Sequence, residues 1–298
     1  MKKIVTVMLV LVLALGTMTI LTACNTSIDG MEYKLSTDDD GNQYYTALLY
    51  TDSTIRNDVV ILDEIDGIPV TAMGVSCFTQ CSNLYTITIG KNMANIDNWG
   101  ITNNTYLKAI YVDEENENYC SVEGILYSKD CKELICYPNA IDVEYNALGA
   151  LISPTKSVTI AEGVEVVTNQ AFYNCYAVSE IIFSSTVKEI GGLAFLDCTS
   201  LESIIFNEGL EVIGENCFLG CTSANLTEVT LPSTIKELYD GAFYGCKYLV
   251  TVNINVCQAD LADIYFQSGW QPCSGGKTIT GNIVGSDFSY AFTDWKGV

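Results

Sequence analysis

Apolar residues recur in one fixed frame through most of the chain, with a period of about two dozen residues. Each unit begins with an apolar residue, continues through a short alternating run and ends on a phenylalanine. Phe172, Phe195 and Phe218 are spaced by 23 and 23 residues, and Phe243 follows after 25. Self-similarity at a period of this size indicates stacked structural repeats, so we expect a solenoid.

Each unit predicts two short extended pieces separated by turns. In LESIIF, residues 201–206, the alternation places Ile204 and Phe206 inward, and LEVI, residues 210–213, predicts a second strand. GENCFLGC, residues 214–221, is too short and too rich in glycine for a long helix, so we expect one helical turn there. The predicted fold class is therefore an α/β solenoid, a right-handed stack of short strands and short helical turns with about 23 residues per repeat.

The repeat resembles the BspA-like class of bacterial leucine-rich repeats. The pattern Leu-x-x-Ile-x-Phe, a turn and Ile-Gly-x-x-Ala-Phe-x-x-Cys is carried by LESIIFNEGLEVIGENCFLGC and LTEVTLPSTIKELYDGAFYGC. YCSVEGILYSKDCKELICYP, residues 119–138, is similar to a β-hairpin that this class inserts between repeats, and residues 58–74 are similar to its leading segment. The resemblance covers about residues 58–138 and 155–256, and it implies adhesion or another interaction role.

The frame and the resemblance together predict the domain organisation. The solenoid spans residues 58–256 in roughly seven or eight turns, with the hairpin insertion at about 119–138. Residues 139–156 do not fit the frame and are expected to be irregular. Residues 24–57 are expected to form a linker and N-terminal cap, and residues 257–298 a C-terminal cap.

The first 23 residues have the pattern of a signal peptide. Lys2 and Lys3 precede an apolar run that closes with Leu-Thr-Ala before Cys24. This ending resembles the lipobox of bacterial lipoproteins, which implies cleavage before Cys24 and a diacylglyceryl thioether on its sulfur. Two or more acyl chains on one residue would hold the chain stably to a membrane, facing outward. An uncleaved membrane anchor is the alternative.

A cysteine follows the phenylalanine by three residues in five of the units. In one further unit Ile101 takes the phenylalanine position and Asn104 takes the cysteine position. Asn and Cys are both small side chains that donate a hydrogen bond, and cysteine tolerates full burial. We therefore expect a buried structural column of free thiols, with one asparagine, whose side chains donate to neighbouring carbonyls. Its members are Cys81, Asn104, Cys175, Cys198, Cys221 and Cys246.

Disulfides and zinc are alternative uses of the cysteines. Beyond Cys24 the chain has an even number, 12, of cysteines, which in an exported protein favours disulfides. The more plausible disulfide partners lie outside the column and are Cys120, Cys131, Cys136, Cys257 and Cys273. The spacing Cys77-x3-Cys81, repeated at Cys217 and Cys221, suits zinc on a helical turn, but alanine fills the first position in other repeats, which favours a small core residue.

Charge and composition exclude several functions. The formal net charge is −22, and removal of Lys2 and Lys3 makes it −24, so binding to nucleic acid is disfavoured. The sequence has no histidine, which excludes Ser-His-Asp and Cys-His catalysis and His-based zinc motifs within this chain. Carboxylates, lysines and cysteines remain as catalytic groups. No cofactor is predicted.

Three short motifs resemble ligand sites in part, but each has a simpler structural interpretation. STDDDGNQYY resembles part of a calcium loop, but the twelfth position falls on Ala47, so we expect a hairpin turn at Asp40 and Gly41. DEENEN, residues 113–118, is expected to be a solvated acidic turn. SGGKTITGN lacks the spacing of a phosphate-binding loop and is assigned to the cap.

Residues between the inward pairs of the first strand face outward and form the candidate binding column. Ile182 and Ile205 are adjacent apolar members, which is mildly suggestive of contact with a partner. Tyr173, Tyr176 and neighbouring tyrosines at 244 and 248 cluster at the turn edge as a second candidate surface. The column comprises Thr88, Tyr111, Thr159, Ile182, Ile205, Thr230 and Asn253.

The favoured function is a surface lipoprotein that binds an extracellular protein or glycan, without catalysis. Its predicted partners are a membrane, through the lipid on Cys24, and an unidentified macromolecule outside the cell, with nucleic acid excluded. The alternative is a structural or assembly subunit of a cell-envelope complex. A more remote alternative is an exported glycosidase that uses two carboxylates.

Overall fold

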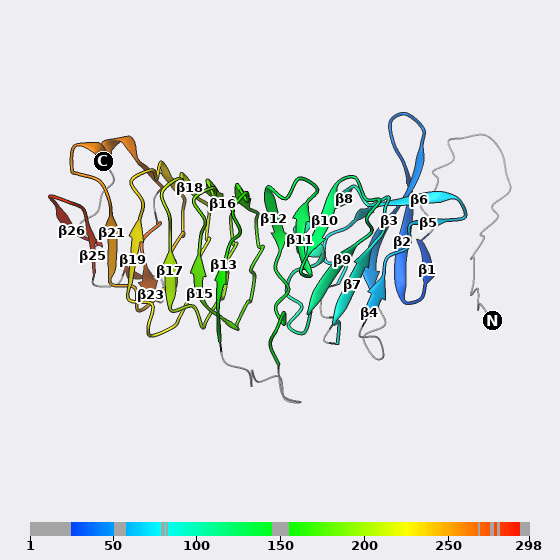
Figure 1. The fold of residues 1–298 in the computed structure, drawn as a ribbon, viewed down its shortest axis with the longest axis horizontal. Helices are drawn as coiled ribbons and strands as arrows, with labels where there is room; N and C mark the ends of the chain where they lie inside the picture. Colours follow the sequence, from blue (N-terminus) through cyan, green and yellow to red (C-terminus); the bar gives the residue numbers. More distant parts are fainter. Residues whose placement is uncertain are drawn as a thin grey trace, which may run out of the picture.

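The fold is a long stack of short strands. The computed structural model describes residues 25–50, 58–78, 81, 83–144, 155–267, 269–274, 277–278 and 281–292. The first and last described strands, β1 (Asn25–Ile28) and β26 (Ser289–Ala291), lie at opposite ends of the stack (Figure 1). The predicted signal peptide and Cys24 lie outside the described residues.

The first strand of each turn contributes to one face of the stack, in two sheets. The first sheet has three parallel strands and the second has seven, of which only the last pair is antiparallel. These strands are β4 (Asp58–Val60), β7 (Thr86–Ile89) and β9 (Ala109–Val112), followed by β13 (Lys156–Thr159), β15 (Val178–Ile182), β17 (Ser203–Ile205), β19 (Glu228–Leu231), β21 (Thr251–Ile254), β25 (Asn282–Val284) and β26.

The second strand of each turn contributes to two further sheets. In the N-terminal sheet, β1, β2 (Met31–Thr37) and β3 (Gln43–Tyr50) are antiparallel and form a cap whose last strand pairs in parallel with β6 (Ile68–Met73). β6 also pairs with β5 (Glu64–Ile65) and β8 (Asn95–Ile96). The other sheet runs through β10 (Tyr119–Val122), β11 (Ile125–Ser128), β12 (Glu133–Cys136), β14 (Val166–Val167), β16 (Glu189–Ile190), β18 (Val212–Ile213), β20 (Glu237–Leu238) and β22 (Tyr265–Phe266). A separate hairpin pairs β23 (Cys273–Ser274) with β24 (Lys277–Thr278).

The architecture is a solenoid of stacked strands, as predicted, but the α/β description with helical turns is not confirmed. The described residues contain only two short 3₁₀ segments, at Asn98–Gly100 and Asp260–Asp263. The segments around each phenylalanine are consecutive tight turns. Their backbone cannot continue as a helix because residues two before and two after the phenylalanine have left-handed φ angles. These pairs are Gln170 and Asn174, Leu193 and Asp197, Asn216 and Gly220, and Gly241 and Gly245.

A ladder of stacked aromatic rings fills the interior. Phe172, Phe195, Phe218 and Phe243 are fully buried, with successive ring centroids 4.7, 5.1 and 5.4 Å apart and nearly parallel planes. Tyr137 extends the ladder, since its ring lies 4.6 Å from that of Phe172. Burial of each ring removes a large apolar surface from water, so the ladder stabilises the contact between successive turns.

The thiols of the predicted column lie beside this ladder. Cys198 Sγ donates to the carbonyl of Phe172 at 3.1 Å, and Cys246 Sγ donates to that of Phe218 at 3.1 Å. Both cysteines are fully buried. Asn104, also buried, donates through Nδ2 to the carbonyl of Ile101 within its own turn, at 2.6 Å. In each case a small donor satisfies a backbone carbonyl that water cannot reach.

The hairpin insertion occupies one turn of the stack, in the middle of the molecule (Figure 1). Tyr137 takes the phenylalanine position of its turn. Its amide donates to the carbonyl of Ala171 in the next turn, just as the amide of Phe172 donates to the carbonyl of Ala194. Ala140 and Val143 then follow at the cysteine and leucine spacings, and both are buried. The frame therefore extends into the stretch predicted to be irregular, of which residues 145–154 lie outside the described residues.

Two kinds of turn alternate along the C-terminal half, so the side chains at the turn repeat every two turns. In one kind the sequence Glu-Gly provides a carboxylate, and in the next Ser-Thr provides hydroxyls that bond to it. Ser233 donates to Glu208 through its backbone amide at 3.2 Å and its hydroxyl at 2.8 Å, and Ser185 contacts Glu162 in the same way. The turns therefore form bonded pairs.

The same alternation appears in a column of charges beside the second strands, which we term the charge ladder. Glu165 pairs with Lys132 at 2.8 Å and with Lys188 at 3.1 Å. Glu211 pairs with Lys236 at 2.8 Å one turn further along. The backbone amide of each later member donates to the carbonyl of the member one turn earlier, so successive members are in register. In order along the chain the ladder is Lys132, Glu165, Lys188, Glu211 and Lys236.

Candidate functional site

The predicted binding column lies on the first-strand face. Thr88 pairs with Tyr111 across β7 and β9, and Ile182 pairs with Thr159 and Ile205 across the following sheet. The column continues in register to Thr230 and Asn253, and Val60 and Val284 extend its two ends. Its most exposed apolar members are Val60, Tyr111 and Ile205, at 63%, 52% and 40%.

A cleft of about 1040 Å³ interrupts the column between Tyr111 and Thr159. The cleft forms because the hairpin replaces a first strand at this turn. The Ile110 amide of β9 donates to the carbonyl of Gly124 in the hairpin at 2.8 Å, and the hydroxyl of Ser121 donates to the carbonyl of Ile110 at 2.5 Å. The hairpin thereby covers the edge of β9 without continuing the sheet to β13.

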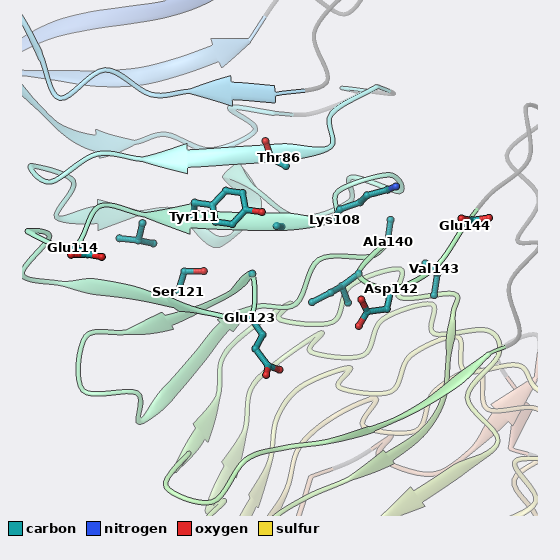
Figure 2. Close-up of a pocket in the computed structure, with 14 residues that line it drawn as sticks. Thr86, Lys108, Tyr111, Glu114, Ser121, Glu123, Ala140, Asp142, Val143 and Glu144 are labelled. Carbon is teal, nitrogen blue, oxygen red and sulfur yellow. The ribbon is translucent and has the colours of Figure 1, made fainter.

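The walls of the cleft come from β7, through Thr86, from β9, from the hairpin and from the segment that follows the hairpin. Figure 2 shows Tyr111 on β9, Ser121 and Glu123 on the hairpin side, and Asp142 on the segment that follows the hairpin. That segment is fixed at Ala140, whose amide donates to the carbonyl of Leu107 at 2.8 Å. Gly124 has a φ of 82° and lies so close to β9 that a Cβ would stand 2.9 Å from the Cβ of Ala109.

The cleft is acidic. Four carboxylates line it, against one lysine, Lys108. Lys156 lies behind the wall, where its Nζ donates to the carbonyl of Ile141 at 2.7 Å and lies 3.8 Å from Asp142. Burial lowers the pKa of the Lys156 amino group. The four carboxylates belong to Glu114, Glu123, Asp142 and Glu144.

An exposed tyrosine ring beside carboxylates is suited to contact a basic or hydroxyl-rich ligand. The face of Tyr111 offers an apolar surface with a negative quadrupole, which attracts cations and packs against flat apolar groups. Carboxylates at its side accept hydrogen bonds from ammonium, guanidinium or hydroxyl groups. Among the described residues, no group of three or more acidic or cysteine side chains is arranged to hold a metal ion.

The tyrosines at the turn edge are spread along the stack. Tyr173 packs against Trp99 of the N-terminal half, with ring centroids 5.8 Å apart and the rings edge to face. Tyr244 and Tyr248 lie at the far end, and Lys247 lies over the Tyr248 ring at 4.9 Å. The Trp99–Tyr173 contact joins the two halves of the solenoid, which gives these two rings a structural role.

The remaining sequence candidates fall into structural positions. Asp38 accepts from the amides of Asp40 and Asn42 in the turn between β2 and β3, so this carboxylate holds a hairpin. Cys77 is buried with its sulfur 3.7 Å from that of Met31. Asn116, in the acidic loop at 113–118, is fully buried and donates to the carbonyls of Gly90 and Met93.

Of the residues that line the cleft, the sequence had singled out only Tyr111, in the outward column, and Glu114, in the acidic loop at 113–118. Ser121, Glu123 and Asp142 belong to the hairpin and to the segment that did not fit the frame. The only available signal was that the frame is interrupted immediately after the strand that carries Tyr111.

These features define the class of protein. The fold is that of a leucine-rich-repeat solenoid, with apolar positions, turns and thiols repeated in each turn. The family described as BspA type Leucine rich repeat region matches in six copies, over residues 64–121 and 143–269. The chain therefore belongs to the BspA-type leucine-rich-repeat family. No curated protein matches it.

Several solved structures of bacterial proteins are similar. The pneumococcal vaccine antigen PcpA has a TM-score of 0.51 and 16% identity, over 87% of this chain and 90% of that one. A leucine-rich-repeat protein from Eubacterium ventriosum has a TM-score of 0.49 and 18% identity, covering 91% and 96%. A leucine rich cell surface protein from Faecalibacterium prausnitzii has a TM-score of 0.46 and 14% identity, covering 87% and 99%. The likeness to PcpA concerns the fold alone.

Within the segments described above, no helix has the length and apolar character needed to cross a bilayer.

Proposed function

We propose that the protein is a non-catalytic binding protein of a bacterial cell surface, exported by its signal peptide and held to the membrane through a lipid on Cys24. Its first-strand face and the cleft contact an extracellular protein or glycan. The observation that carries the proposal is the outward column, which exposes the Tyr111 ring at an open cleft and further apolar side chains, among them Val60 and Ile205, along the same face.

The charge of the cleft supports a ligand with basic groups. Four carboxylates and a net chain charge of −22 attract a cationic partner and repel an anionic one. A glycan rich in amino groups and a basic protein segment both meet this requirement. Because the cleft is open to solvent, its attraction for the ligand should weaken as salt is added.

The experiment is a binding screen of the exported protein against extracellular matrix proteins, host proteins and cell-wall glycans. For any ligand that binds saturably, we expect Tyr111→Ala and Ile205→Asp each to weaken binding about tenfold, the loss of one well-placed contact. Tyr265→Ala is the matched control, because Tyr265 is 57% exposed on β22, in the second-strand sheet. Unchanged affinity in both test variants would contradict the proposed surface.

The same preparation separates the alternatives. Co-purification of envelope proteins after cross-linking in intact cells, with no binding to external ligands, would favour an assembly subunit. Release of free sugar from a glycan would show turnover and overturn the non-catalytic assignment.

The lipid anchor has its own test. Cys24→Ala should move the protein from the membrane fraction to the soluble extracellular fraction, because no thioether can form. Cys257→Ala, which removes a different cysteine, should stay with the membrane. Equal distribution of the two variants would contradict lipidation at Cys24.

A further inference from the structure

The hairpin holds two cysteine side chains against each other. Cys120 Sγ lies 3.2 Å from Cys131 Sγ. Cys120 is half-buried on β10, and Cys131 is exposed in the turn between β11 and β12. Cys120 Sγ also lies 3.2 Å from the carbonyl oxygen of Ser128. The column thiols Cys198 and Cys246, in contrast, are fully buried and contact backbone carbonyls.

The backbone fixes both sulfurs near this position. Cys120 is in register with Tyr127 across the β10–β11 pair. Cys131 donates its amide to the carbonyl of Ser128 at 2.9 Å, and Asp130 holds the turn by accepting from the Ser128 hydroxyl at 2.8 Å. Because Ser128 also pairs with the strand that carries Cys120, the turn and the strand move as one unit.

We propose that Cys120 and Cys131 form a disulfide in the exported protein, which closes the hairpin that forms one wall of the cleft. A bonded pair requires a sulfur separation of about 2 Å, so the sulfurs must approach by roughly 1.2 Å, which a small side-chain rotation provides. Exported proteins meet oxidising disulfides, and an exposed thiol is open to attack on them.

The reaction balances as a thiol–disulfide exchange. The Cys131 thiolate attacks a disulfide of the oxidant, which forms a mixed disulfide and releases one thiolate. The Cys120 thiolate then attacks the Cys131 sulfur and releases the second. The two protons lost by the cysteines protonate the released groups, and the two electrons reduce the oxidant's disulfide to two thiols.

Trypsin provides a direct test of the pairing. Cleavage after Lys108, Lys129 and Lys132 places Cys120 in peptide 109–129 and Cys131 in peptide 130–132, so the two can share one ion only through a disulfide. Exported protein should be alkylated at once, digested without reductant and analysed by mass spectrometry. We expect the linked peptides, which separate after reduction.

Two variants make the result decisive. Cys120→Ser should abolish the linked ion and leave Cys131 alkylated, whereas Cys257→Ser, which removes another half-buried thiol, should leave the linked ion unchanged. Hydrogen exchange of β10–β12 should be slower in the oxidised protein than in protein treated with reductant.

Oxidation of the purified protein tests the pairing even if the two thiols are kept reduced in the cell. Purified protein equilibrated with oxidised glutathione should lose two thiols and gain the same linked ion. The proposal is overturned if both cysteines remain alkylatable after this treatment, or if Cys131 is linked to a different cysteine.

Discussion

At the scale of single residues, the buried thiols act as small hydrogen-bond donors whose charge is suppressed. Burial raises the pKa of Cys198 and of Cys136 from 9.0 to about 12. In the native state these sulfurs remain protonated well above neutral pH, and the thiolate is the form that reacts with alkylating agents. The buried thiols of the column should therefore react slowly in the native protein, although the column contains several cysteines.

The raised pKa values predict a stability that falls in alkaline solution. Well below pH 9 the thiols are protonated in both the folded and the unfolded chain, so they add no pH dependence there. As the pH rises from 9 toward 12, the unfolded chain loses these protons and the folded chain keeps them, so the free energy of unfolding decreases. Urea unfolding at a series of pH values measures this decrease, and Cys198→Ala should make it shallower.

Reaction with iodoacetamide provides the matching kinetic test. At pH 8 the native protein, with the Cys120–Cys131 pair first reduced, should react rapidly at Cys131, which is exposed, and only slowly at Cys198, which is fully buried. After denaturation both should react at similar rates. Rapid labelling of Cys198 in the native state would show that the thiol column is not buried.

Leu193 is strained in its turn. Its φ is 57°, which costs an L-residue with a large side chain about 1–2 kcal/mol, and the equivalent residue one turn later is Asn216, which tolerates this conformation better. Leu193→Asn should therefore raise the free energy of unfolding by about 1 kcal/mol in chemical denaturation. Leu196→Asn is the control, because the same exchange outside the left-handed positions should give no gain.

At the scale of elements, the alternation of lysine and glutamate in the charge ladder favours unlike turns as neighbours. Lys188 stands between Glu165 and Glu211 in the charge ladder, 3.1 Å from Glu165. The pairs are largely exposed, so each attraction is worth little alone, but like charges in adjacent strands repel.

Reversal of one charge tests the ladder. Lys188→Glu places three carboxylates in consecutive turns and should lower the free energy of unfolding by about 1 kcal/mol at low salt. Most of this loss should disappear in 1 M salt, because the side chains are exposed to screening ions. Lys188→Gln, which removes the charge without reversing it, should cost less. An equal loss in both variants at every salt concentration would contradict an electrostatic role.

The repeat and its inward residues could be predicted from the sequence, because the buried positions of every turn must be apolar and therefore recur at a regular spacing. Ile204 and the four stacked phenylalanines are buried as their spacing indicates. The helical turns were mispredicted because left-handed φ angles at Gln170 and Leu193 carry no local sequence signal, unlike those at glycine. The cleft was not predictable because its walls come from an insertion whose position depends on tertiary hydrogen bonds to β9.

At the scale of the whole molecule, the described interior has two large apolar clusters that meet at the hairpin, beside a small third one made of Ala140, Val143 and Ala177. One contains Leu126 and the N-terminal repeats, and the other contains Leu134 and the C-terminal repeats. A polar contact also joins the halves, in which Asn174 donates to Asn103 at 2.6 Å. Because turns contact mainly their neighbours, the halves should be able to lose structure separately.

Deletion of one core side chain in each cluster tests this division. Phe218→Ala should cost about 3–5 kcal/mol and should accelerate hydrogen exchange in β13–β22 more than in β4–β9. Phe78→Ala, in the other cluster, should show the opposite distribution. Uniform acceleration along the chain in both variants would show that the solenoid opens as a single unit.

The pairing of unlike turns also constrains how such a chain can lengthen over generations. Duplication of one turn would set glutamate beside glutamate and leave a hydroxyl turn without its carboxylate neighbour. Duplication of a pair copies a complete module with both of its junctions intact. We therefore expect descendants of this gene to gain or lose material in steps of about 46 to 48 codons, twice the spacing of its phenylalanines, rather than in single turns.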